Sequence, residues 1–104
     1  MPFAVHLTDA DKAYLDNLPL SARAKAHLTD FIDYALAKVD AAFRTDPDNR
    51  MGPNQSFFKR AFLLVDAWGD DRWHRIEFVV DDAHAGEGKL VVVFIDHQDG
   101  EWTW

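Results

Sequence analysis

The sequence predicts an α+β domain in which a helical hairpin covers one face of a four-stranded, mostly antiparallel sheet. Residues 3–8 alternate apolar and polar side chains, which is the pattern of a half-buried strand. Apolar residues then recur in steps of three and four as far as Phe43, and the period returns to two from Phe57. The predicted order is an N-terminal strand, a helical hairpin and a three-stranded antiparallel meander. Such a hairpin can cover only one face of the sheet.

Composition sets the limits on size, compartment and partners. A chain of 104 residues that is 48% hydrophobic is expected to form a single domain over residues 1–104. The net charge of -7 argues against a broad nucleic-acid-binding surface, which needs cationic side chains. The chain has no cysteine, so disulfides and thiolate metal sites are excluded. The start is too short and too polar for a signal peptide and no apolar run is long enough for a membrane helix, so we expect a cytoplasmic protein without membrane contact.

The helix boundaries follow from capping signals. Thr8 fits an N-cap and Asp11 the capping-box position, which predicts a first helix over about residues 9–18. Ser21 then caps a second, long helix whose apolar stripe continues to Phe43. With only a few residues between them, the two helices should run antiparallel.

The second half of the chain predicts the meander. Residues 57–68 and 72–81 read as a β-hairpin closed by the turn GDD at 69–71. Residues 89–95 are apolar on both faces and so predict a central strand, and 96–104 read as a polar and aromatic tail. The expected interior side chains are Leu28, Phe31, Leu36, Phe62, Leu64, Ile76, Phe78 and Phe94.

The stretch RWHRIEFVV at 72–80 has two arginines and a histidine at the beginning of a predicted strand. Alternation places His74, Ile76, Phe78 and Val80 toward the helices, and Trp73, Arg75, Glu77 and Val79 on the open face. A three-residue turn would set Val65 opposite Arg75 and put Lys59 on the same open face. His74 is then expected to be an interior or rim histidine with satisfied hydrogen bonds rather than a ligand. For Arg75 two interpretations remain: a surface pair with Glu77 or stacking on Trp73, or a binding site.

Three segments of the chain resemble the RelE/ParE family of bacterial toxins from toxin–antitoxin pairs. The stretch TDADKAYLDNLPLSARAKAHLTDFIDYAL resembles the family's helical hairpin, and DDRWHRIEFVV resembles its arginine-bearing strand. The segment KLVVVFIDHQDGEW resembles its closing strand and tail, with His97 on the family's histidine and Trp102 near its aromatic residue. The resemblance covers about residues 3–102.

The resemblance implies two different activities. RelE-type members cut messenger RNA in the ribosome without a metal or other cofactor. In that case Arg75, Lys59 and His97 would be the catalytic residues, while Arg60, Trp73 and Trp102 would bind substrate. ParE-type members instead bind DNA gyrase. Either activity implies an antitoxin partner, and a homodimer is a further candidate assembly.

This sequence departs from the nuclease pattern in its charge. Asp96, Asp99 and Glu101 stand in the tail, where ribosome-directed members carry basic residues. Two functions therefore stay open: a metal-independent endoribonuclease, and a non-catalytic protein-binding module of the gyrase-inhibitor kind or a degenerate relative. A small metal enzyme ranks last, because the sequence has no HExxH motif, no thiolates and no clustered histidines.

Overall fold

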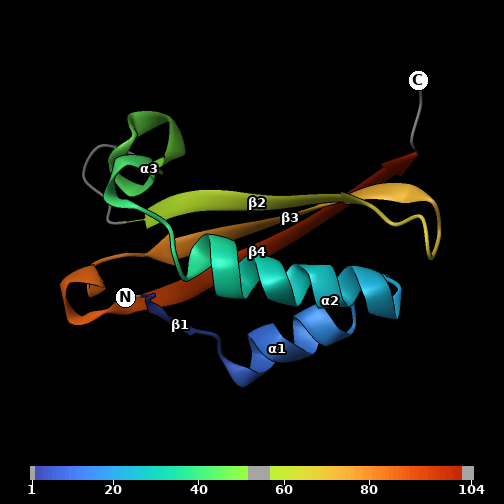
Figure 1. The fold of residues 1–104 in the computed structure, drawn as a ribbon, viewed down its shortest axis with the longest axis horizontal. Helices are drawn as coiled ribbons and strands as arrows, with labels where there is room; N and C mark the ends of the chain where they lie inside the picture. The colour runs from blue at the N-terminus through green and yellow to red at the C-terminus, as the bar shows by residue number, and fades with distance from the viewer. Residues whose placement is uncertain (1, 52–56, 102–104) are drawn as a thin grey trace.

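A computed structural model describes residues 2–51 and 57–101, and in these residues the chain forms the predicted α+β arrangement (Figure 1). Helices α1 (Asp9–Asp16) and α2 (Ala22–Phe31) lie on one face of a four-stranded sheet. The strands, in the spatial order β1-β4-β3-β2, are β1 (Ala4–His6), β4 (Lys89–Glu101), β3 (Arg72–Asp81) and β2 (Phe57–Val65). The last three pair antiparallel, while the short β1 joins β4 in parallel, so the sheet is mixed. The predicted fold class is confirmed.

Both helices begin at the predicted caps. The Thr8 hydroxyl accepts from the backbone N–H of Asp11 at 3.0 Å, and the Asp11 carboxylate accepts from the N–H of Thr8 at 3.1 Å. This reciprocal pair is the capping box that the sequence predicted. The Ser21 hydroxyl accepts from the N–H of Ala24 at 3.1 Å and so starts α2.

The prediction that the second helix continues to Phe43 is wrong. After α2 the backbone widens into a single π-helical turn, Ile32–Leu36, and the helix ends there. Leu36, Ala37 and Val39 are all buried at the end of this turn. The carbonyl of Ala37 also accepts from the N–H of Phe3 at 2.7 Å, which ties the end of the helix to the start of the chain.

The segment after this break forms two short helices beside the start of β2 (Figure 1). They are α3 (Ala41–Thr45), capped by Asp40, and the 3-10 turn Pro47–Asn49. Arg44 and Arg50 both pair with the largely buried carboxylate of Asp82, at 3.3 and 3.2 Å, at the far end of β3. These two ion pairs hold the segment against the sheet.

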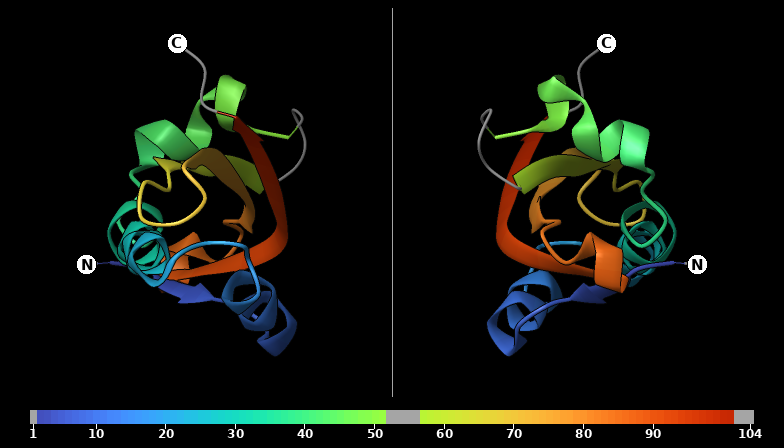
Figure 2. Two further views of the ribbon diagram at one scale, coloured as in Figure 1. Left: turned by 90° about the vertical axis from the view of Figure 1, so that its right-hand side faces the viewer. Right: turned by 90° about the vertical axis from the view of Figure 1, so that its left-hand side faces the viewer.

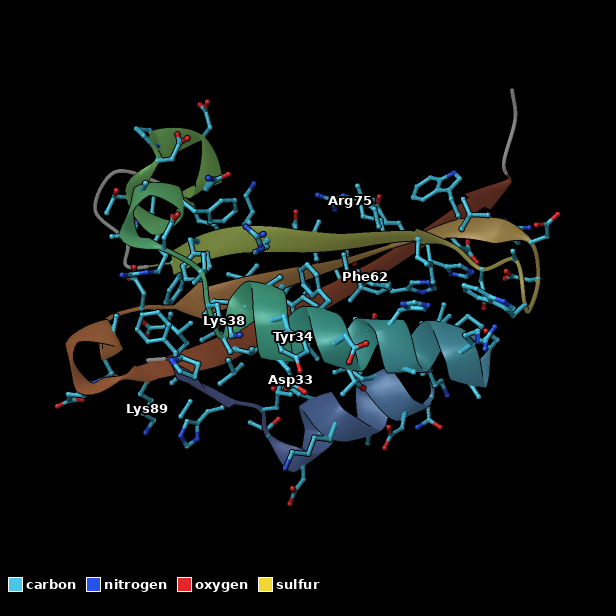
Figure 3. The ribbon with its side chains drawn as sticks, viewed as in Figure 1. Asp33, Tyr34, Lys38, Phe62, Arg75 and Lys89 are labelled. Carbon is cyan, nitrogen blue, oxygen red and sulfur yellow. The ribbon has the colours of Figure 1, made fainter. Side chains whose placement is uncertain are left out.

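The β2–β3 hairpin has a longer loop than predicted. Strand β2 ends at Val65, the loop spans residues 66–71, and Leu63 rather than Val65 stands opposite Arg75. The pairing is displaced by two positions, so each side chain keeps its predicted face. Figure 3 shows Phe62 on the helix side of the sheet and Arg75 on the opposite side. The loop is longer because Asp66 leaves the strand to bind Ser21.

Strand β4 is longer than predicted, and this overturns one core assignment. It continues to Glu101, because residues 96–101 pair with β3 instead of forming a tail. A bulge between Val79 and Val80 places Phe94 opposite Val79 on the open face, where Phe94 is 58% exposed. Phe94 is therefore not an interior residue.

The remaining core predictions describe the molecule well. Leu28, Leu36, Phe62, Ile76 and Phe78 are buried, and Phe31 and Leu64 are partly buried against them. Seen from either end, β4 curves so that the sheet bends toward the helices (Figure 2). The core occupies the space between that concave face and the helices.

Candidate functional site

The open face of the sheet carries the charged residues that the sequence singled out. On β3 this face presents Trp73, Arg75, Glu77 and Val79; residues opposite them on β2 are Val65, Leu63, Ala61 and Lys59. Strand β4 adds Gly100, Gln98, Asp96 and Phe94. Cross-strand partners share a face of the sheet, so these twelve positions define the open face.

Arg75 forms an ion pair with a residue of its own strand. Its guanidinium contacts the Glu77 carboxylate at 2.6 Å, as one of the two predicted interpretations required. Lys59, Arg75 and Glu77 border a shallow hollow of about 250 Å³ that α3 and the following turn close on one side. Within the described residues, this hollow is lined by both signs of charge, because Asp48 stands against the basic side chains. Such a lining is poorly suited to binding a phosphodiester chain.

Apolar side chains flank this charged band on both sides. Leu63 is 67% exposed and Phe94 is 58% exposed, on the two strands that border β3. Val79, which the sequence predicted to add to the exposed apolar surface, is only 5% exposed. Trp73 is half-buried because its indole lies over Gly100, where an added Cβ would come within 2.5 Å of Nε1. The most exposed apolar side chains of the open face are thus Leu63 and Phe94, and Trp73 is partly exposed beside them.

Only some of the predicted nuclease residues come together: Lys59, Arg60 and Arg75 border the same hollow, and His97 is not among its lining residues. Arg75, Lys59 and Trp73 lie on the open face. Arg60 stands opposite Phe78 on the other face, with its guanidinium 4.4 Å from the centre of the Phe43 ring. His97 stands opposite Ile76 and therefore also lies on the helix-facing side. The substrate-binding role predicted for Trp102 falls outside the described residues.

A second group of polar residues lies on the helix-facing side, at the loop end of the sheet. His74 is fully buried, as predicted for an interior histidine. Its Nε2 is 3.0 and 3.1 Å from the two carboxylate oxygens of Asp70, and its Nδ1 is 2.9 Å from Nε2 of His97. These contacts form a continuous chain from Asp70 through His74 to His97.

The contacts of this chain couple the proton positions of its members. An ionised carboxylate only accepts, so Nε2 of His74 donates to Asp70. If Nδ1 of His74 carries no proton, it accepts from Nε2–H of His97. The ring centres of the two histidines are 5.2 Å apart and the planes differ by 11°. That separation is as large as a 2.9 Å N···N contact permits, so both nitrogens lie on the line between the ring centres. The rings therefore meet end to end in a nearly common plane, as an in-line hydrogen bond requires.

Two pKa shifts follow from this arrangement. The hydrogen bond from His74 lowers the pKa of Asp70 from its ordinary value of 3.8, which keeps the carboxylate ionised at neutral pH. Burial, and next the neighbouring His74, lower the pKa of His97 from 6.5. The neutral form of His97 is therefore favoured at neutral pH.

The hairpin loop at residues 66–71, which carries Asp70, is anchored by the buried carboxylate of Asp66. Asp66 is fully buried and accepts from the backbone N–H of Ser21 at 2.7 Å and from its hydroxyl at 2.6 Å. The same hydroxyl caps α2, so Asp66 links the hairpin loop to the start of the helix. This link fixes the loop that carries Asp70.

Sequence reasoning missed the histidine cluster because His97 was assigned to a tail. Once β4 continues past Ile95, the register puts His74 opposite Asp99 and His97 on the same face two residues before it. One nitrogen from each histidine and one oxygen of Asp99 lie within 4.8 Å of one another. The histidines are thus clustered in space although they are 23 residues apart in the chain. The available signal was the spacing of His97 and Asp99, which places both on one face of any strand that contains them.

A second group, Asp66, Asp70 and His74, also brings three potential metal ligands together. Its members are already engaged, because Asp66 accepts from Ser21 and His74 Nε2 donates to Asp70. The group is therefore better described as part of the hydrogen-bonded support of the hairpin loop.

Comparison with known proteins adds no relative. The chain matches no family model, no curated protein and no solved structure. In residues 2–51 and 57–101, no helix is long and apolar enough to span a membrane.

Proposed function

We propose that this chain is a toxin-type domain, of the kind the RelE/ParE resemblance implies, that acts by binding a protein through its open sheet face. The observation that carries the proposal is the pattern on that face: Leu63 and Phe94 are exposed on either side of the Arg75–Glu77 pair. Exposed apolar side chains around a charged centre are typical of a protein-binding surface.

The binding function is favoured over RNA cleavage by charge and by placement. A nuclease of this family would need Arg75 to hold phosphate, yet Arg75 is paired with Glu77 at 2.6 Å. It would also need His97 near Arg75, and the two lie on opposite faces of the sheet. Asp96 adds negative charge to the open face itself.

The proposed partners follow from the same surface. A target protein, as gyrase is for ParE-type toxins, would bury Leu63 and Phe94 and would meet both signs of charge at Arg75 and Glu77. An antitoxin that covers the same face would block the toxin by competition. Both partners are proposals that rest on the family resemblance.

The test is controlled expression of the chain in a bacterial host, with growth and messenger RNA ends measured together. We expect growth arrest with intact messages. Arg75→Ala should leave the messages intact as well, and should weaken the arrest only to the extent that Arg75 contacts the target.

Two results would contradict the proposal. Message cleavage that begins with expression would restore the nuclease function, and its loss in Arg75→Ala would place the active site on the open face. Normal growth with abundant, folded protein would remove the toxin function altogether.

A further inference from the structure

Independently of the proposed function, we propose that Nδ1 of His74, Nε2 of His97 and a carboxylate oxygen of Asp99 bind one divalent transition-metal ion of the Zn²⁺ class. The three residues come from two adjacent strands and share one face, with His74 directly opposite Asp99 and His97 diagonal to His74. One nitrogen of each histidine and one carboxylate oxygen of Asp99 lie within 4.8 Å of one another. Imidazole nitrogen together with carboxylate oxygen is a ligand set that suits zinc.

Asp70 supports this assignment, because it orients His74 as metal-binding proteins orient their histidines. A metal-ligating histidine usually donates its second ring N–H to a carboxylate, which fixes the tautomer and directs the other nitrogen at the ion. Asp70 makes this contact with Nε2 of His74 at 3.0 Å. The lone pair of His74 Nδ1 is thereby directed toward His97, in a site where the His74 side chain is fully buried.

The ion can enter only if the His97 ring moves, because the two nitrogens now face each other in line. Two nitrogens bound to one tetrahedral zinc at about 2.0–2.1 Å lie about 3.3 Å apart. Nδ1 of His74 and Nε2 of His97 are 2.9 Å apart. The pair must therefore separate, and His97 must also turn so that its Nε2 lone pair faces the ion at a tetrahedral angle to that of His74. His97 is partly exposed, which leaves room for this rotation. Its proton moves from Nε2 to Nδ1, so the ring keeps one proton in total.

The site would offer three protein ligands and an open position. Asp99 has 41% of its side chain exposed, so the fourth position faces solvent and can hold a water molecule. The Arg72 guanidinium, 3.7 Å from Asp99, is the charge that competes with a cation for this carboxylate. Replacing Arg72 should therefore strengthen metal binding.

The experiment is a calorimetric titration of the chelator-treated full chain with ZnCl₂, together with visible absorption spectra recorded with CoCl₂. We expect one ion per chain and the intense visible bands of tetrahedral Co²⁺. Asp70→Asn should weaken binding by about 10–100-fold, the usual effect of losing a carboxylate that orients a ligand. His97→Gln removes a nitrogen ligand and should weaken binding further, while Arg72→Gln should tighten it.

Two further variants keep the test decisive. Asp99→Asn changes an exposed side chain, so it should fold normally and still weaken binding. His84→Gln is the matched control, because His84 and Glu87 form an exposed pair at 3.0 Å in a distant turn. No saturable binding to the chelator-treated chain would overturn the proposal. Binding that survives Asp99→Asn and His97→Gln but is lost in His84→Gln would overturn it as well.

Discussion

Replacing Asp66 with alanine tests the contact that fixes the hairpin loop. The Asp66 carboxylate accepts two hydrogen bonds from Ser21, at 2.7 Å from the backbone N–H and 2.6 Å from the hydroxyl. Hydrogen bonds to a charged group contribute about 1.5–3 kcal/mol each, and the cost of burying the charge offsets part of that sum. We therefore expect Asp66→Ala to lower the free energy of unfolding by about 3 kcal/mol.

The assay is thermal and urea unfolding followed by circular dichroism. For a domain of this size, about 1 kcal/mol shifts Tm by roughly 4–8 °C, so Asp66→Ala should lower Tm by roughly 12–24 °C. Asp33→Ala is the matched control, because Asp33 is exposed on the π-helical turn, where Figure 3 labels it. Its effect should stay within about 0.5 kcal/mol.

A double-mutant cycle with Ser21→Ala shows whether the loss comes from this contact. Ser21 and Asp66 touch, so the two substitutions should couple by about 1 kcal/mol or more. Asp66 does not anchor the loop through Ser21 if Asp66→Ala is no more destabilising than Asp33→Ala, or if the effects of Asp66→Ala and Ser21→Ala simply add.

Three further predictions concern the sheet and its histidines. Phe78→Ala should lower the free energy of unfolding by about 3–5 kcal/mol in urea, because Phe78 is fully buried; a loss below 1 kcal/mol would mean that the core is wrongly placed. Gly100→Ala should quench or shift the fluorescence of Trp73 and lower Tm, because the new methyl group would meet the indole; an unchanged spectrum and Tm would contradict the close approach. In chelator-containing buffer, the free energy of unfolding should fall as the pH drops below about 6.5. Burial and the neighbouring His74 lower the pKa of His97 in the folded chain, so the unfolded chain binds a proton that the folded chain does not. His97→Gln should flatten that pH dependence, and an equal slope in both proteins would show that another group titrates.

The predictions from the sequence were confirmed where nearby residues alone determine the local structure. Thr8 and Ser21 cap helices because their hydroxyls satisfy backbone N–H groups that no helical carbonyl can reach. The division of residues 72–80 between two faces also held, since it depends only on alternation along a strand.

The predictions were wrong where the structure of a segment depends on residues that are distant in the sequence. The second helix ends early, at a point where the N–H of Phe3 at the start of the chain binds the carbonyl of Ala37. Phe94 is exposed because of a bulge, which no period in the sequence reports. His97 joins His74 only through the register of β3 and β4, so the histidine cluster could not be found by scanning the chain for a motif.

The most direct test of the binding function compares growth arrest by two aspartate variants that differ only in the face they occupy. Leu63 is 67% exposed on the open face, while Tyr34 is 63% exposed on the helical side (Figure 3). If the open face binds the target, Leu63→Asp should relieve the growth arrest caused by the unaltered chain, and Tyr34→Asp should leave it intact. Both variants should be expressed at equal levels and should show the same circular dichroism. Arrest of equal strength by both variants, or relief by Tyr34→Asp alone, would contradict the account.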